Sequence, residues 1–162
     1  MKKVICCILP VLIVMLCACS SGTGEPELLY DYEKTVSAEC PQGWTLELAD
    51  GEGVDRVLAP GSTDTAYAGM SLNSYEESIT FDEYLLSLAE GFEDFADITV
   101  AGHTGGLIIR SRTAENGEAG AEATFIADGR LYSLSYYAST AELFEQYFEV
   151  FESTVNTLTL IK

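Results

Sequence analysis

The chain has a single histidine, and this shortage excludes whole classes of site. A metal centre built on two histidines is impossible, and a Ser-His-Asp triad would have to use His103. The G-x-S-x-G motif that presents a nucleophilic serine is absent, since residues 69–73 depart from it at the last position. Residues 102–106 lack the G-K-[ST] ending of a phosphate loop and lead into a predicted strand. We therefore predict a non-enzymatic protein without a cofactor, with His103 as an exposed residue of a hairpin turn.

Basic residues are also few, eight lysines and arginines against 26 aspartates and glutamates, for a formal net charge of −18. Lys2 and Lys3 belong to the extreme N-terminus, and without them the chain carries −20. Such a domain repels nucleic-acid phosphates and anionic lipid headgroups, so we expect no nucleic-acid partner. Simple solvation of a surface protein explains the acidity, and attraction of cations or of a basic partner is the alternative.

Internal disulfides are not expected, because four of the five cysteines lie within the first 19 residues and leave Cys40 alone. Residues 4–18 form an apolar run behind Lys2 and Lys3, which is the pattern of a secretory signal. The run is shorter than the roughly 20 apolar residues of a spanning helix. An uncleaved membrane anchor is the alternative, and Pro10 together with the abrupt change to polar residues 20–24 argues against it.

The end of this run, Leu16-Cys17-Ala18-Cys19, resembles the lipobox of bacterial lipoprotein signal peptides. The resemblance implies cleavage before Cys19 and lipid attachment to that cysteine. We predict a signal peptide at 1–18, a flexible tether at 19–28 and one domain at 29–162, lipid-anchored in the cell membrane and facing outside the cytoplasm.

The rest of the chain alternates between strand and helix periodicity. Two helices are expected. The first begins at the Thr80/Glu83 capping box and has an apolar face that continues to Phe95, and the second begins at Ser139. Strands are expected over short segments separated by turn residues such as Asn116-Gly117 and Asp128-Gly129, namely 33–39, 44–48, 54–59, 67–74, 98–100, 107–113, 121–127 and 131–137. This order predicts an α+β fold in which helices cover an antiparallel sheet as an α/β/α sandwich.

The order of several short motifs resembles the PsbP-like family over roughly residues 29–162. The motifs are Pro41-x-Gly43-Trp44, Met70-Ser71-Leu72-Asn73, Val100-x-Gly102 and Gly129-x-Leu131-Tyr132-Ser133-Leu134, followed by a Phe-rich last helix. The family shares its fold with a Ran-binding nuclear import factor and with many bacterial lipoproteins. The resemblance implies a PsbP-like fold and an accessory or binding module without catalytic activity.

Two groups of residues are candidate binding sites. Asp50, Glu52 and Asp55 offer oxygen ligands for Ca²⁺ but lack the EF-hand spacing, so they are weak metal candidates. The tyrosines of the last strand are expected mostly in the core, and an exposed remainder together with neighbouring arginines is the possible partner surface: Tyr132, Tyr136, Arg110 and Arg112. We expect a non-catalytic module that binds an envelope protein. The alternative is a binder of a small ligand or cation, through the acidic surface or a cleft between sheet and helix.

Overall fold

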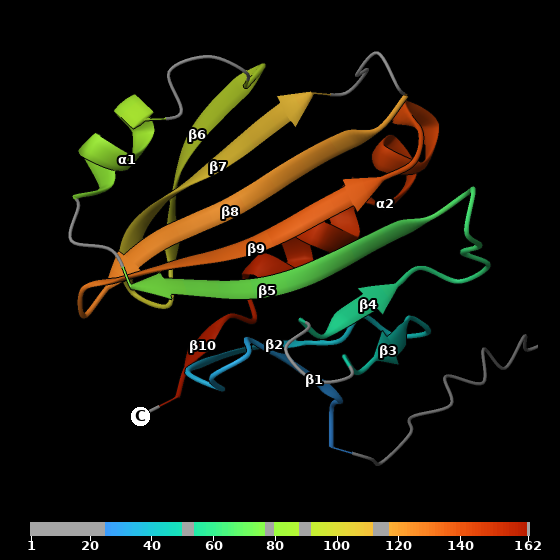
Figure 1. The fold of residues 1–162 in the computed structure, drawn as a ribbon, viewed down its shortest axis with the longest axis horizontal. Coiled ribbons are helices and arrows are strands. Elements are labelled where there is room, and N and C mark those ends of the chain that lie inside the picture. Colours follow the sequence, from blue (N-terminus) through green and yellow to red (C-terminus); the bar gives the residue numbers. More distant parts are fainter. Residues whose placement is uncertain (1–24, 50–53, 77–79, 88–91, 112–116, 162) are drawn as a thin grey trace, which may run out of the picture.

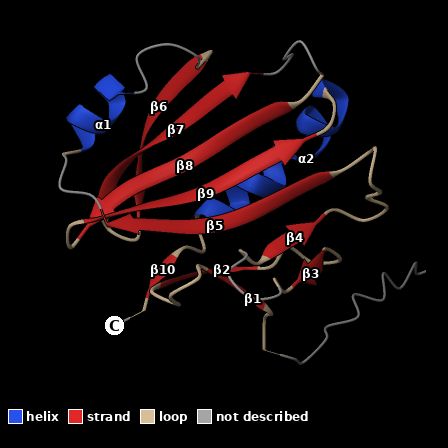
Figure 2. Cartoon of the chain, in the orientation of Figure 1, coloured by secondary structure: helices blue, strands red, loops and turns tan. Residues whose placement is uncertain are grey.

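The computed structural model describes residues 25–161, apart from 50–53, 77–79, 88–91 and 112–116. It shows an α+β fold with one large antiparallel sheet, one small sheet and two helices (Figures 1 and 2). The predicted α+β class, with helices on an antiparallel sheet, is confirmed. Within these ranges, neither helix has the length and apolar character needed to cross a membrane.

The large sheet has seven strands, and all neighbouring strands run antiparallel. From one edge to the other they are β3 (Thr45–Glu47), β4 (Arg56–Leu58), β5 (Ala68–Glu76), β9 (Arg130–Ala138), β8 (Ala119–Ala127), β7 (His103–Ser111) and β6 (Asp94–Val100). The long strands β5, β9, β8 and β7 form its centre, and β9 pairs with β5 over nine residues and with β8 over nine.

Two tight turns set the register of the hairpins in this sheet. Asp128 and Gly129 have φ of 51° and 75°, and Ala101 and Gly102 have φ of 48° and 83°. Positive φ at both central residues matches the right-handed twist of hairpin strands, which explains the glycine at each second position. The turn predicted over 101–106 therefore occupies only 101–102, and β7 begins at His103.

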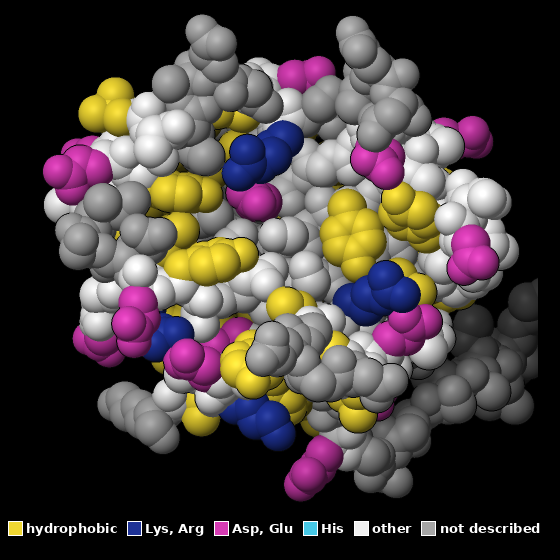
Figure 3. All heavy atoms as spheres, in the orientation of Figure 1, with side chains coloured by type: hydrophobic (Ala, Val, Ile, Leu, Met, Phe, Trp, Pro, Cys, Tyr) yellow, Lys and Arg dark blue, Asp and Glu magenta, His cyan; other side chains and the backbone are white. Residues whose placement is uncertain are grey.

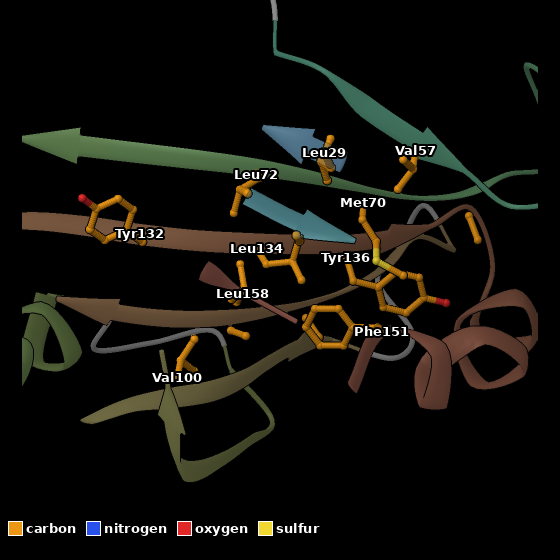
Figure 4. Packing of buried hydrophobic residues seen from close by; sticks show 14 of the residues in the cluster. Leu29, Val57, Met70, Leu72, Val100, Tyr132, Leu134, Tyr136, Phe151 and Leu158 are labelled. Carbon is orange, nitrogen blue, oxygen red and sulfur yellow. The ribbon is translucent and has the colours of Figure 1, made fainter. Parts of the chain in front are cut away.

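Helix α2 (Ala141–Val155) covers one face of the large sheet. The sheet residues that face it are apolar, and Figure 4 shows their side chains packed together. Those with no more than 1 % exposure include Met70, Leu72, Ala121, Ala123, Phe125, Leu134 and Tyr136. On the helix, Phe144 and Phe151 are fully buried, whereas Tyr147, Phe148 and Val155 of the predicted buried face are half-buried.

Tyr136 joins this helix to the sheet. Its ring lies between Phe144 and Phe151, with centroid distances of 5.1 and 5.3 Å and interplanar angles of 30° and 18°. Its hydroxyl lies 2.9 Å from the carbonyl oxygen of Phe144 and 3.1 Å from that of Leu143, both in the first turn of α2. Burial of this hydroxyl raises the pKa of Tyr136, so it stays protonated and donates at any physiological pH.

The small sheet packs against β5 of the large sheet and against α2. It contains β1 (Leu28–Tyr30), β2 (Val36–Glu39) and β10 (Thr159–Leu160), with β2 in the centre. Asp31 stabilises the turn between β1 and β2, because its carboxylate accepts from the amides of Thr35 (2.6 Å) and Val36 (3.0 Å). It also accepts from the Ser74 hydroxyl at 2.6 Å, which connects the small sheet to β5.

The first helix is shorter than its sequence pattern predicts. Helix α1 (Phe81–Ser87) has the predicted capping box, with the Thr80 amide donating to Glu83 at 2.8 Å and the Glu83 amide donating to the Thr80 hydroxyl at 3.3 Å. The prediction of helix as far as Phe95 is wrong, because Phe95 lies in β6 and pairs with Ile108. Long-range strand pairing outweighs the local helical period here.

The N-cap of α2 is Thr140 rather than the predicted Ser139. The Thr140 hydroxyl accepts from the amide of Leu143 at 3.2 Å. Ser139 instead makes two hydrogen bonds to Tyr67, the residue before β5: its hydroxyl accepts from the Tyr67 amide at 3.0 Å and its amide donates to the Tyr67 carbonyl at 2.9 Å.

Removing only the Tyr136 hydroxyl tests its role in holding α2. We expect Tyr136→Phe to lower the free energy of unfolding by about 0.5–1.5 kcal/mol, because one buried hydrogen bond is lost while the ring packing stays. Urea denaturation followed by circular dichroism measures this. Tyr32→Phe is the control, since Tyr32 is 65 % exposed and should leave stability unchanged. Equal stability of the two variants would contradict the assignment.

Asp31 should make stability depend on pH. Its burial raises the pKa, but the hydrogen bonds from Ser74, Val36 and Thr35 outweigh burial and lower it below the ordinary value. A lowered native pKa stabilises the fold above the unfolded pKa of about 3.9, and this contribution disappears as pH falls through the native pKa. Asp31→Asn should therefore destabilise the protein at pH 7, with a difference from wild type that shrinks below pH 4. A difference independent of pH would show that charge is not involved; Asp64→Asn, on an exposed loop, is the control.

Candidate functional site

Among the described elements, only α1 lies over the face of the large sheet opposite α2, at its margin, and we call this face the open face. Opposite residues of neighbouring antiparallel strands point to the same side, so the register identifies which side chains lie on it. One row crosses all seven strands in the order Phe95, Ile108, Glu122, Ser135, Ser71, Arg56 and Glu47. The next row contains Asp97, Gly106, Thr124, Ser133 and Asn73.

The centre of the open face is a floor of small uncharged polar side chains. Asn73 donates to Ser71 at 3.5 Å, and the hydroxyls of Ser133 and Ser135 are 3.5 Å apart, so these bonds are long and weak. The Thr124 hydroxyl is fully buried and has no partner among the described residues. Ser133 is also buried, so the accessible hydrogen-bonding capacity of the floor comes from the half-buried Ser71, Asn73 and Ser135.

An Arg–Glu–Tyr cluster lies at one end of this floor. Arg110 binds Glu122 at 2.8 Å, with side-chain exposures of 45 % and 20 %, and its guanidinium also contacts the Tyr84 hydroxyl of α1. Burial raises the pKa of Tyr84, and the Glu122 carboxylate adds to the increase while Arg110 opposes it. The phenol is therefore neutral and can hydrogen-bond at neutral pH.

A second cluster of the same composition lies at the other end. Arg56 binds Glu47 at 2.8 Å and contacts the Tyr137 hydroxyl. The Tyr137 ring lies over Gly69, where a Cβ atom would come within 2.8 Å of it. Since Glu122 and Arg56 are three strands apart, the clusters are separated by roughly 14 Å of sheet.

Aromatic rings surround the floor on both sides, as Figure 3 shows. Beside the first cluster, Phe81 and Phe95 lie over Gly106, where a Cβ would come within 2.9 and 2.4 Å of their rings. Beside the second, Tyr67 packs edge-on to Tyr137 at 6.2 Å. Tyr75, also on this face, is 50 % exposed. The open face thus has a polar centre, two charged clusters and an aromatic margin.

The structure corrects the predicted partner surface. Tyr132 and Tyr136 are only 4 % and 1 % exposed and belong to the core, so the favoured expectation of burial holds and they do not contribute to a partner surface. Arg110 does lie on the exposed side, whereas Arg112 lies outside the described residues. Sequence reasoning missed Tyr84 and Arg56 and did not assign Tyr137 to the exposed face. The available signal was the Ser133-x-Ser135-x-Tyr137 alternation, whose polar members indicate the face that is not covered.

Of the weak metal candidates, only Asp55 lies in the described part of the chain. The Asp55 carboxylate accepts from the Ala49 amide at 2.9 Å, and Asp50 and Glu52 lie outside the described residues. In the described part of the chain, no three His, Cys, Asp or Glu side chains are close enough to hold a metal ion. Cys19 also lies outside the described ranges.

His103 differs from its predicted role as an exposed turn residue. It is half-buried at the start of β7, and its ring stacks on Phe125 with a centroid distance of 6.0 Å. Within the described ranges it makes no hydrogen bond to a serine or a carboxylate, so the structure gives it a packing role.

No protein-family model matches the chain, and no curated protein matches its sequence. Solved structures do share the fold. One is PA94 of Pseudomonas aeruginosa, a protein of unknown function, at 15 % identity and a TM-score of 0.54, covering 86 % of this chain and 99 % of that one. Another is the cyanobacterial PsbP protein (CyanoP) of Synechocystis sp. PCC 6803, at 10 % identity and a TM-score of 0.52, covering 86 % and 96 %. The fold is PsbP-like.

A third similar structure comes from Bacteroides thetaiotaomicron, at 13 % identity and a TM-score of 0.53. The match covers 86 % of this chain but only 50 % of that protein, so this chain spans about half its length. At such identities the likeness shows the fold alone. The predicted PsbP-like fold is confirmed, and the function has to be argued from the site.

Substituting Gly69 tests the packing of the second cluster. A Cβ at this position would lie within 2.8 Å of Tyr137 and 2.9 Å of Leu58. We expect Gly69→Ala to displace the Tyr137 ring, to separate its hydroxyl from Arg56 and to cost about 1–3 kcal/mol. Gly120→Ala is the matched control, because the nearest atom, the Tyr136 carbonyl, is 3.4 Å away. NMR shifts of Tyr137 that stay unchanged in Gly69→Ala would contradict this packing.

Proposed function

We propose that this chain is a lipid-anchored, non-catalytic binding module that works outside the cytoplasmic membrane and engages an envelope protein through the open face. The open face is the single observation that carries the proposal. A sheet face that only α1 covers, at its margin, among the described elements has two preformed Arg–Glu–Tyr clusters on either side of a polar floor, and this is the composition of a recognition surface.

The chemistry of the open face suits a protein partner. Tyrosine and arginine are enriched in protein interfaces and dominate their binding energy. Each arginine is already held by its own glutamate, so little side-chain freedom remains to be lost on binding. Exposed ion pairs contribute only about 0.2–1 kcal/mol to folding stability. A gain in stability is therefore a poor explanation for the two arginine–glutamate pairs.

The lipid anchor follows from the N-terminal sequence. The resemblance of residues 16–19 to a lipobox supports lipid on Cys19, and residues 20–27 would span on the order of 30 Å at full extension. That reach lets the domain rotate and present the open face to a neighbour in the envelope. The strong negative charge disfavours direct contact with anionic headgroups and nucleic acid.

The described side chains also support a role without catalysis. His103 is used in packing against Phe125, and the clustered arginines and glutamates are paired with one another. The alternative of a specific metal ligand receives no support from the described carboxylates. Acidic residues on a different surface, near the N-terminal end of the domain, can attract cationic groups.

Cys19→Ala tests the anchor. In bacterial cells fed a radiolabelled fatty acid, we expect label on the wild-type protein and none on the variant, because the acceptor thiol is gone. The protein should also move from the membrane fraction to the soluble or secreted fraction. Cys40→Ala is the matched control and should keep its label. Equal labelling of Cys19→Ala and wild type would refute the lipid assignment.

Arg56→Gln and Arg110→Gln test the open face. After cross-linking in intact cells, we expect recovery of the envelope partner to fall at least ten-fold in the double variant, corresponding to about 1.4 kcal/mol or more. Lys34→Gln, which removes an exposed positive charge elsewhere, should leave recovery unchanged. Undiminished recovery from the arginine variant would move the partner site away from the open face.

A further inference from the structure

A second concave surface lies away from the open face, between the Cys40–Trp44 turn and the C-terminal half of α2, and we call it the Trp44 groove. It is an open groove of about 1010 Å³. Its walls come from three parts of the chain: the segment just before β1, the turn after β2, and α2 with the residues after it. The amide of Trp44 donates to the Pro41 carbonyl at 3.0 Å, and Gly43 has φ of 81°, so a tight turn fixes the indole in place.

Three glutamates line the groove: Glu27, Glu39 and Glu149. None of them forms an ion pair within the described ranges, in contrast to the glutamates of the open face. Burial, together with the Glu27 carboxylate, raises the pKa of the neighbouring Cys40 thiol to about 11, as expected where the local potential is negative. The groove therefore presents unneutralised carboxylates on a structured wall.

Helix α2 adds to this negative potential. Ser153, Thr154 and Thr157 bring the C-terminal end of the helix to the groove, and the last turn of α2 has no basic residue. A helix C-terminus carries about half a negative charge, which favours cations nearby. The rigid connection between Glu39 and the helix end preserves this geometry, because the Glu39 amide donates to the Thr157 hydroxyl at 2.9 Å and that hydroxyl donates to the Thr154 carbonyl at 2.7 Å.

The floor of the groove is apolar rather than uniformly acidic. Trp44 packs edge-on against Tyr147 with a centroid distance of 5.4 Å, and Pro41 and Val150 lie beside it. A free metal ion or polyamine would bind the carboxylates but would leave the apolar floor exposed to water. A peptide with both basic and aliphatic side chains would pair its basic groups with the carboxylates and bury its aliphatic groups on the apolar floor.

We infer that the Trp44 groove binds an extended peptide segment of a partner protein, one in which arginine or lysine alternates with aliphatic residues. The carboxylates and the helix C-terminus receive the cations, and the apolar surface formed by Pro41, Trp44 and Val150 receives the aliphatic side chains. The site is separate from the open face and does not depend on lipid at Cys19, so it stands or falls independently of the proposed function.

Trp44 is the only tryptophan of the chain, so its fluorescence reports directly on the groove. The full-length protein, in neutral detergent micelles, is titrated with a nine-residue peptide of alternating Arg and Leu. We expect a saturable change in Trp44 emission. The Glu39→Gln/Glu149→Gln variant should bind at least ten-fold more weakly, and Glu142→Gln, at the opposite end of the same helix and outside the groove, should bind like wild type.

Two further probes distinguish binding by charge alone from binding by charge and apolar contact together. A matched peptide with Ser in place of Leu, and spermidine, should each bind at least ten-fold more weakly than the Arg–Leu peptide. Equal binding of spermidine, or equal binding by the Glu39→Gln/Glu149→Gln variant, would overturn the inference in favour of diffuse cation attraction. A fluorescence signal that does not change with any probe would also overturn it, whatever the outcome of the lipid-labelling and cross-linking experiments.

Discussion

The contact of Tyr136 with α2 is the interaction on which the rest of the structure depends. One side chain provides the ring between Phe144 and Phe151 and the hydroxyl that binds the first-turn carbonyls of the helix. Because it fixes the only long helix in the described ranges on one face of the sheet, the opposite face keeps no cover beyond α1 at its margin. The same placement of α2 brings its C-terminal end beside the Cys40–Trp44 turn. Both candidate surfaces therefore depend on where α2 packs.

The two surfaces differ in whether their charged side chains form ion pairs. On the open face, Arg56 and Arg110 each form an ion pair with a glutamate, so each pair has no net charge. We expect recognition there to depend on shape and hydrogen bonding. In the Trp44 groove the carboxylates have no described cation beside them. In the proposal made above, such a module holds one partner through the first surface and attracts a basic segment through the second.

The class of fold could be predicted from sequence because its signals are local. Asp128-Gly129 marks a hairpin since both residues need positive φ, and the Thr80/Glu83 capping box marks a helix start. The end of α1 could not be predicted in this way, and the sequence favoured burial of Tyr132 and Tyr136 without identifying the residues that bury them. Both features depend on partners distant in sequence: Ile108 and Gly106 for Phe95, and α2 for Tyr136. Alternation along β9 separated the two sets of side chains, but only the position of α2 decides which set is exposed.

The central claim is that the open face contacts a protein in the envelope. Incorporating a photo-cross-linking amino acid at position 75, in the margin of the open face, and separately at position 32, in the turn between β1 and β2, tests it in intact cells. Both native tyrosines are at least half exposed, so access is comparable. The account predicts a discrete protein adduct from position 75 and none from position 32. No adduct from position 75, or the same adduct from both positions, would contradict it.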